Sequence, residues 1–249
     1  MFETELKQAF VLYDRGGPTS GKNMEVIAEG GWAMFEDVQR QSEPAIPWER
    51  DDLSRLGEIC RSTMIRLIEH SNGNHPPAVW RARSLALFTE AGSANGTAMV
   101  ILGLALGAFS EGDVTSALAQ FDVMELIIHD DDGVITGDLV RSAVLENRAI
   151  VQGAMGQWNE ARESLRRVIE IEQRREPVGL RRVLKARAAL TTIDYAEGEV
   201  DAAIASLQEI VRAARENGDA GIVADKGDAN LVRMEARVPW TELLQYQVI

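Results

Sequence analysis

A glycine-rich segment near the amino terminus has nearly the spacing of a phosphate-binding loop. Residues Gly16-Gly-Pro-Thr-Ser-Gly21-Lys22-Asn23 approach the pattern G-x-x-x-x-G-K-[ST], in which backbone amides and the lysine hold phosphate groups. The pattern needs a hydroxyl after the lysine to bind Mg²⁺, and Asn23 stands there instead. It also needs a parallel sheet, for which only Phe10–Tyr13 is strand-like. We therefore favour an ordinary turn between helices and keep a nucleotide-dependent enzyme as a remote alternative.

An acidic tetrapeptide has part of the pattern of a calcium loop. In Asp130-Asp131-Asp132-Gly133 the glycine would be the invariant glycine of the calcium-binding loop, and it therefore sets the positions of the ligands. The first ligand would then be Ile128 and the closing bidentate glutamate would be Leu139, and neither side chain can bind a cation. We interpret the segment as a solvated connector that also caps the helix after it.

Histidine and cysteine residues are too few to build a metal or catalytic site. His70 and His75 flank a loop, and neither they nor His129 have a further ligand at a defined spacing. Cys60 is the only cysteine, so an intrachain disulfide is excluded, and its place beside Ile59 on an apolar helix face favours packing over nucleophilic chemistry. We expect no catalytic residues, no metal and no cofactor.

Basic residues are concentrated in one part of an acidic chain. The sequence has 26 basic and 39 acidic residues, a net charge of −13, which disfavours binding to nucleic acid. Eight basic residues nevertheless cluster around one predicted helix–turn–helix: Arg166, Arg167, Arg174, Arg175, Arg181, Arg182, Lys185 and Arg187. Two interpretations are open. Five of these residues would dock an acidic segment of a partner (Arg174, Arg175, Arg181, Arg182 and Lys185), or the cluster is a solvated face with internal pairs such as Glu170–Arg174.

Apolar residues recur at spacings of three and four along almost the whole chain, which is typical of helices. Glycine and proline clusters separate these segments. The predicted helices are Glu3–Asp14, Lys22–Gln41, Asp51–His70, Ala78–Glu90, Gly96–Ser110, Val114–Ile128, Asp138–Met155, Asn159–Arg174, Gly179–Ala196, Val200–Asn217, Ala220–Arg237 and the short Trp240–Gln245.

The chain contains an internal repeat marked by Gly112, Gly156 and Gly198, which are 44 and 42 residues apart. Around each glycine the same residue types recur: a small residue seven before (Ala105, Ala149, Thr191), an alanine five after (Ala117, Ala161, Ala203), and larger apolar residues nine and twelve after (Phe121, Leu165, Leu207; Met124, Val168, Ile210). We expect the glycine to end one helix and the small residues to let the antiparallel second helix approach closely. One pair cannot bury its apolar face alone, so neighbouring pairs must stack.

This pattern resembles the tetratricopeptide repeat, in a long form whose period exceeds the usual length of about 34 residues. The resemblance rests on Leu104-Ala105 with Ala108 and on the residues that follow each of the three glycines. It implies an all-α fold, a right-handed superhelix of antiparallel helix pairs. We expect residues 1–95 to form divergent helical pairs or a cap, residues 96–217 three repeats, and residues 218–249 a capping helix and tail.

In such a superhelix the first helix of each pair lines the concave face. The residues expected there are Leu102, Leu106, Phe109, Glu146, Ile150, Lys185, Thr192 and Tyr195. They would form a groove with an apolar end and a polar end, suited to a peptide or helix. Alternatively, the amino-terminal helices of the chain cover part of this face. Trp48 and Trp240, each after a proline, are candidates for exposed anchors.

No segment has the character of a membrane span or a secretory signal. The most apolar run, Ala98–Phe109, is shorter than the roughly 20 residues that a span needs. The first residues lack a basic region followed by an apolar one, so we expect a cytoplasmic protein.

Taken together, the residues predict a non-enzymatic adaptor or scaffold that binds a protein or peptide in its groove. The alternative is a regulatory protein that senses a peptide, which requires two conformations with different ligand affinities. A homo-oligomer is compatible with either function.

Overall fold

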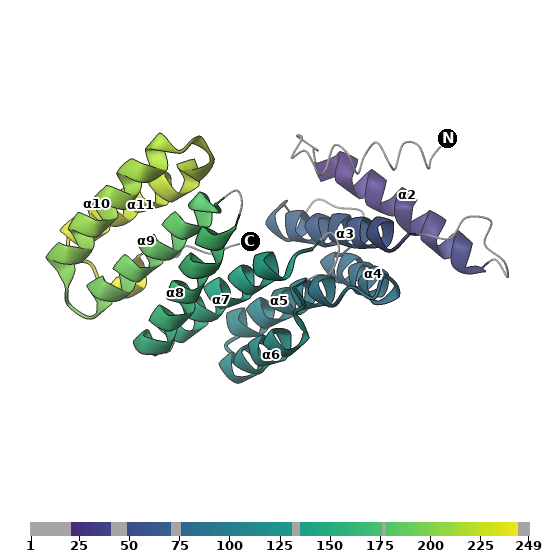
Figure 1. Ribbon diagram of the computed structural model, residues 1–249, viewed down its shortest axis with the longest axis horizontal. Coiled ribbons are helices and arrows are strands. Elements are labelled where there is room, and N and C mark those ends of the chain that lie inside the picture. The colour runs from purple at the N-terminus through teal and green to yellow at the C-terminus, as the bar shows by residue number, and fades with distance from the viewer. Residues whose placement is uncertain (1–20, 41–48, 71–75, 131–134, 176–177, 244–249) are drawn as a thin grey trace. The chain divides into compact units, whose positions relative to one another are not determined.

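The computed structural model describes residues 21–40, 49–70, 76–130, 135–175 and 178–243 (Figure 1). All regular elements in these ranges are helical: α2 (Gly21–Arg40), α3 (Arg50–His70), α4 (Pro77–Glu90), α5 (Ala94–Ser110), α6 (Val114–Ile127), α7 (Gly137–Ala154), α8 (Trp158–Arg174), α9 (Leu180–Ala196), α10 (Val200–Glu216) and α11 (Gly221–Glu235), with 3₁₀ turns η1 (Gly218–Ala220) and η2 (Trp240–Glu242). The predicted all-α class is confirmed, and each of these α-helices begins and ends within two residues of its prediction. The predicted helix Glu3–Asp14 lies outside the described residues.

The three repeat glycines end their helices in the way that the sequence predicts. Gly112, Gly156 and Gly198 have φ angles of 85°, 73° and 97°, a left-handed conformation that glycine adopts without a Cβ clash. The amide after each glycine donates to a carbonyl five residues earlier, as in Asp113 N to Ala108 O at 2.9 Å. This Schellman geometry satisfies the last carbonyls of the helix.

Within the described ranges the same turn occurs twice more. Gly92 after α4 and Arg237 after α11 have φ angles of 62° and 57°, with matching hydrogen bonds. Only the turns at Gly112, Gly156 and Gly198 are apparent from the repeat pattern, because Leu85 and Thr97 stand where the small residue and the alanine would flank Gly92, and Arg237 is not a glycine.

The repeat positions beside each turn are buried, as expected. The alanines Ala117, Ala161 and Ala203 are fully inaccessible, and the small residues of the preceding helices and the larger apolar residues are buried with them. The helices pack mostly against their sequence neighbours as antiparallel pairs. The sequence pattern therefore corresponds to real helix–helix seams.

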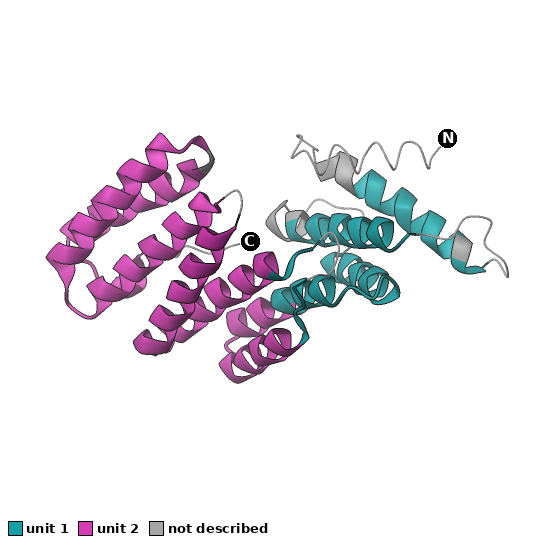
Figure 2. Ribbon diagram, viewed as in Figure 1, with its two compact units in different colours: residues 1–103, 127–137 teal, residues 104–126, 138–249 magenta. Residues whose placement is uncertain are grey.

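The chain divides into two compact units (Figure 2). Unit 1 comprises residues 1–103 and 127–137, in which α2 packs on α3 and α3 on α4. The Ser84 hydroxyl donates to the carbonyl of Gly57 at 2.8 Å, and a Cβ on Gly57 would lie 2.9 Å from the Phe88 ring. Glycine thus permits the close approach of α3 and α4.

Unit 2 comprises residues 104–126 and 138–249. Residues of α7, α8 and α9 share one apolar cluster that includes Leu145, Leu165 and Ile193. A second cluster joins α9, α10 and α11 through residues such as Leu184, Leu207 and Val223. Helix α9 belongs to both clusters, so it is the central packing element of this unit.

None of the described helices has the length and apolar character needed to cross a lipid bilayer.

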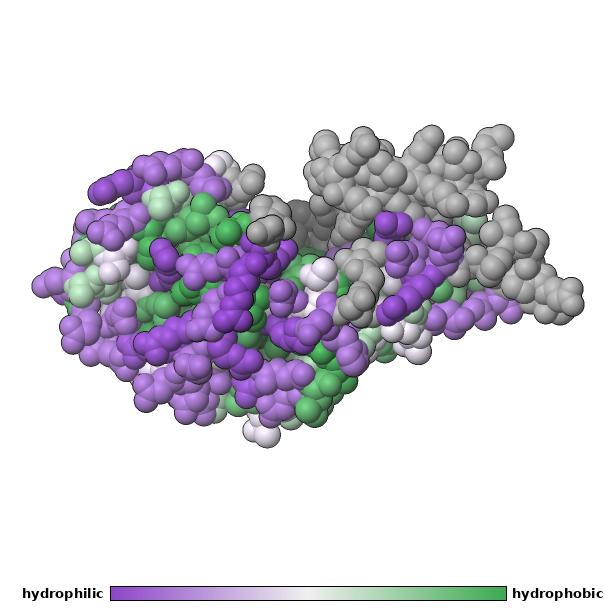
Figure 3. Space-filling view, in the orientation of Figure 1, coloured by the Kyte–Doolittle hydropathy of each residue, from purple (hydrophilic) through white to green (hydrophobic). Residues whose placement is uncertain are grey.

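The face of unit 2 in Figure 3 shows apolar residues in green among purple hydrophilic ones. The expected domain limits at residues 95 and 217 remain predictions.

Candidate binding site

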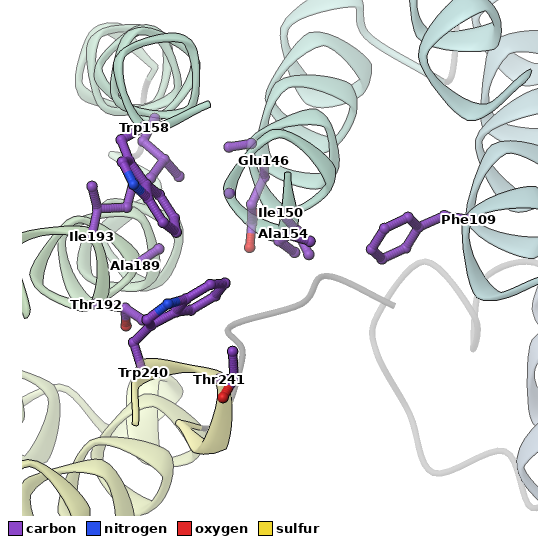
Figure 4. A pocket seen from close by; sticks show the side chains of 13 residues that line it. Phe109, Glu146, Ile150, Ala154, Trp158, Ala189, Thr192, Ile193, Trp240 and Thr241 are labelled. Carbon is purple, nitrogen blue, oxygen red and sulfur yellow. The ribbon is translucent and has the colours of Figure 1, made fainter. Parts of the chain in front are cut away.

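A pocket of about 310 Å³ lies within unit 2 (Figure 4). It is lined by one residue of α5 and by residues of α7, α8, α9 and η2: Phe109, Glu146, Ala149, Ile150, Gly153, Ala154, Trp158, Leu165, Ala189, Thr192, Ile193, Trp240 and Thr241. Its volume falls within the range that is usual for small ligand sites. The pocket is therefore a candidate binding site.

Two tryptophans form one wall of the pocket. The rings of Trp158 and Trp240 meet edge to face, with centroids 4.9 Å apart and an interplanar angle of 89°. The turn before Trp240 is held by the Tyr195 hydroxyl, which donates to the Val238 carbonyl at 2.6 Å. Trp240 is therefore half-buried against Trp158 and is not the freely exposed anchor that its place after Pro239 suggests. Trp48 lies outside the described residues.

Glu146 of α7 places a carboxylate in this apolar surrounding. Its side chain is 1% exposed, and its Oε1 lies 3.0 Å from Nζ of Lys185 on α9. Its Oε2 has no hydrogen-bond partner among the described residues. Burial raises the pKa of Glu146, and the nearby Lys185 opposes that shift.

A second carboxylate, Glu172 of α8, is also fully buried. Its Oε2 accepts a hydrogen bond from Arg175 at 2.7 Å, and its Oε1 lies 3.7 Å from a guanidinium nitrogen of Arg182. Arg182 also donates to the Leu139 carbonyl at 3.2 Å. Burial lowers the pKa of Arg182 and of Lys185, so these cations belong to the interior ion-pair network of unit 2.

The predicted groove residues fall into three groups. Phe109, Glu146, Ile150 and Thr192 line the pocket together, and Lys185 pairs with Glu146. The other three lie elsewhere: Leu102 is buried in unit 1, Leu106 is half-buried, and Tyr195 belongs to the core beside α10 and α11.

The predicted basic docking residues are also divided. Arg175, Arg182 and Lys185 pair with the buried Glu172 and Glu146. Arg174 and Arg181 are exposed, and Arg174 lies 3.9 Å from Glu170, one of the internal pairs expected from its spacing. An arginine whose charge is already compensated inside the fold has less capacity to attract an acidic partner.

The repeat pattern did not predict that Trp158 and Trp240 line this pocket. Trp158 follows Gly156 by two residues, whereas Trp240 lies 82 residues further along. The sequence distinguishes Trp158 only by its size, because the matching residues of the other two repeats are Val114 and Val200. Trp158 packs against the apolar cluster of α7, α8 and α9 and also lines the pocket.

The remaining motifs are placed as follows. Gly16–Ser20 of the phosphate-loop pattern lie outside the described residues, and Gly21, Lys22 and Asn23 open α2. Most of the acidic tetrapeptide and His75 also lie outside them. Cys60 is buried in the core of unit 1, where burial raises its pKa to about 12. The described ranges contain no grouping of three potential metal ligands.

Comparison with known proteins assigns no family. No protein-family model matches this sequence, and no curated protein is similar enough in sequence to be reported as a relative.

Proposed function

We propose that the protein is a non-enzymatic, cytoplasmic adaptor that binds a protein or peptide along the first helices of its repeats. In this proposal α5, α7 and α9 are the first helices of three tetratricopeptide-like repeats, and stacking of the pairs forms a right-handed superhelix. A groove lined by first helices suits an extended or helical peptide.

The observation that carries the proposal is the origin of the pocket-lining residues. Four of them, Phe109, Glu146, Ile150 and Thr192, come from the three helices that the repeat assigns to one face. The same pocket contains two large aromatic rings, and aromatic pockets are typical energetic centres of protein interfaces. Both features support partner binding at this face.

The test is affinity capture from the source cell followed by mass spectrometry, with the wild type and a variant bearing Phe109→Ser and Ile150→Ser. Val232→Ser on α11 is the control, because Val232 is a 68% exposed apolar residue that does not line the pocket. We expect one specific partner whose recovery falls about tenfold or more in the double variant and is unchanged in the control. If the double variant and the control recover the partner equally, and the helical circular dichroism of both is intact, this face is not the binding site.

The exposed arginines support a secondary contact. Arg174 and Arg181 would bind an acidic segment of the same partner outside the pocket. Substituting glutamate at both positions should weaken capture, and added salt should then strengthen the remaining binding, because it screens the repulsion between the new carboxylates and the acidic segment. Unchanged capture would show that the cluster is only a solvated face.

The pocket also favours one alternative, a regulator that senses a peptide. Sensing requires that the ligand bind one of two conformations more tightly. Compaction on addition of a peptide, measured by small-angle scattering, would favour the regulator over a static adaptor.

A further inference from the structure

We propose that the pocket of unit 2 receives a cationic side chain of the partner, an arginine or a lysine, whose head group binds the free carboxylate oxygen of Glu146. This inference rests on the proposed function, because it names the chemistry by which the α5–α7–α9 face recognises its partner. Three features of the pocket support the inference: the unpaired Oε2 of Glu146, the aromatic side chains of the wall and the charge of the lining residues.

The Oε2 atom of Glu146 is the strongest indication of a ligand. It belongs to a side chain that is 1% exposed, and it has no hydrogen-bond partner among the described residues. A buried acceptor without a donor carries a large desolvation cost, so such atoms are rare unless a water molecule or ligand binds them. Because a carboxylate only accepts, the complementary ligand group must donate.

Lys185 prepares the carboxylate for this role. Its Nζ lies 3.0 Å from Oε1 of Glu146 and holds the side chain from the α9 side, while Figure 4 shows Glu146 projecting from α7 toward the pocket. An immobilised carboxylate loses little conformational entropy when a ligand binds. The ion pair thus leaves one oxygen occupied and the other available.

The walls fit an amphipathic side chain with a positive end. Trp158, Trp240, Ile150 and Ala189 offer apolar and aromatic surface to a hydrocarbon stem. The same indole rings attract a guanidinium or ammonium through their π faces. Arginine and lysine combine such a stem with a charged donor, whereas a purely apolar side chain would leave Oε2 unsatisfied.

The distribution of charge favours a cation over an anion. Among the described residues that line the pocket, only Glu146 has a charged side chain, and the Lys185 ammonium that pairs with its Oε1 at 3.0 Å is not part of the lining. A neutral donor such as a tyrosine hydroxyl could reach Oε2, but its hydrogen bond would be weaker than a charge-assisted one.

A matched pair of small probes tests the inference. N-acetylarginine methylamide and the citrulline compound have nearly the same shape, but only the first is cationic. The readout is the change in the indole N–H resonances of Trp158 and Trp240 in titrations of the full chain. We expect the arginine probe to shift both resonances and to bind about tenfold more tightly than the citrulline probe.

Variants connect that preference to one oxygen. Glu146→Gln should abolish the tenfold preference, and Glu209→Gln, the same change at an exposed position on α10, should preserve it. If Glu146→Gln alone unfolds, Glu146→Gln with Lys185→Met removes both charges and provides the same test. Equal binding of the two probes, no shift of either indole, or a preference that survives loss of Glu146 would overturn the inference.

The outcomes separate this inference from the proposed function. A captured partner whose affinity is unchanged by Glu146→Gln would contradict the cationic anchor and leave the adaptor function standing. A chain that shows the arginine preference but captures no protein or peptide would contradict the adaptor function alone.

Discussion

Glu146 and Lys185 form an ion pair of 3.0 Å between α7 and α9, and both side chains are buried, at 1% and 8% exposure. A buried pair of this kind contributes little net stability, because removing both charges from water costs about as much as their attraction returns. Loss of one partner is a different matter, because it leaves the other charge buried without compensation. The stability of unit 2 should therefore respond much more strongly to the loss of one member of the pair than to the loss of both.

Lys185→Met should destabilise the protein at neutral pH by about 3 kcal/mol or more, because it strands the Glu146 carboxylate in an apolar site. The double variant Glu146→Gln with Lys185→Met should lie within roughly 1 kcal/mol of the wild type. Urea unfolding followed by circular dichroism measures both values. Equal destabilisation in the single and double variants would show that packing around Lys185, and not its charge, is what matters.

The stability contributed by Glu146 should fall as pH rises. Its pKa is raised above the ordinary value of 4.5, mainly by burial, so the folded state holds the proton more tightly than the unfolded state does. The contribution is fully present below pH 4.5 and is lost as pH rises through the raised pKa. Urea midpoints of the wild type should therefore decline over this window relative to those of the double variant. A difference that grows with pH would contradict a raised pKa.

Arg162 of α8 pairs with Glu197 and, at 2.7 Å, with Asp194 at the end of α9. The hydrogen bond from Arg162 lowers the pKa of Glu197. The stability that Glu197 contributes is therefore present above the ordinary pKa of 4.5 and is lost as pH falls through the lowered pKa. Arg162→Met should return the Glu197 pKa to its usual range in a carboxyl NMR titration. The control is Asp113, whose pKa is lowered by hydrogen bonds with Ser116 and should stay low. A Glu197 pKa that does not rise would rule out this cause.

Gly156→Ala should destabilise the protein by about 1–2 kcal/mol, because an alanine is strained at a φ of 73°. Gly107→Ala in α5 is the matched control, because a Cβ at either position meets nothing within 4 Å. In its helical conformation the control should gain about 0.5–1 kcal/mol. Thermal or urea unfolding measures both variants, and a loss of stability in both would contradict the role given to the left-handed turn.

The sequence was sufficient to predict features that depend on residues close together in the chain. Each Schellman turn involves six consecutive residues, so Gly112 and its counterparts reveal it directly. Burial of Ala117, Ala161 and Ala203 follows from their constant distance to those glycines. Arg237 shows the limit of this reasoning, because it adopts the same turn without the glycine that would reveal it.

The repeat predicted four residues that line the pocket (Phe109, Glu146, Ile150 and Thr192), but the rest of the pocket could not be predicted, because it depends on contacts between distant residues. Glu146 and Lys185 are 39 positions apart, and Trp158 and Trp240 are 82 apart. Periodicity indicates which helix face an arginine occupies, but it does not show that Glu172 is buried within reach of Arg175 and Arg182. The basic cluster was therefore visible in the sequence, whereas its interior partners were not.

Photo-crosslinking from within the site tests partner binding most directly. Benzoylphenylalanine in place of Phe109 retains an aromatic ring at the pocket, and the same residue in place of the exposed Val232 is the control. We predict that the captured partner is cross-linked from position 109 and not from position 232. A partner that is cross-linked from position 232 and never from position 109 would contradict binding at the face formed by α5, α7 and α9.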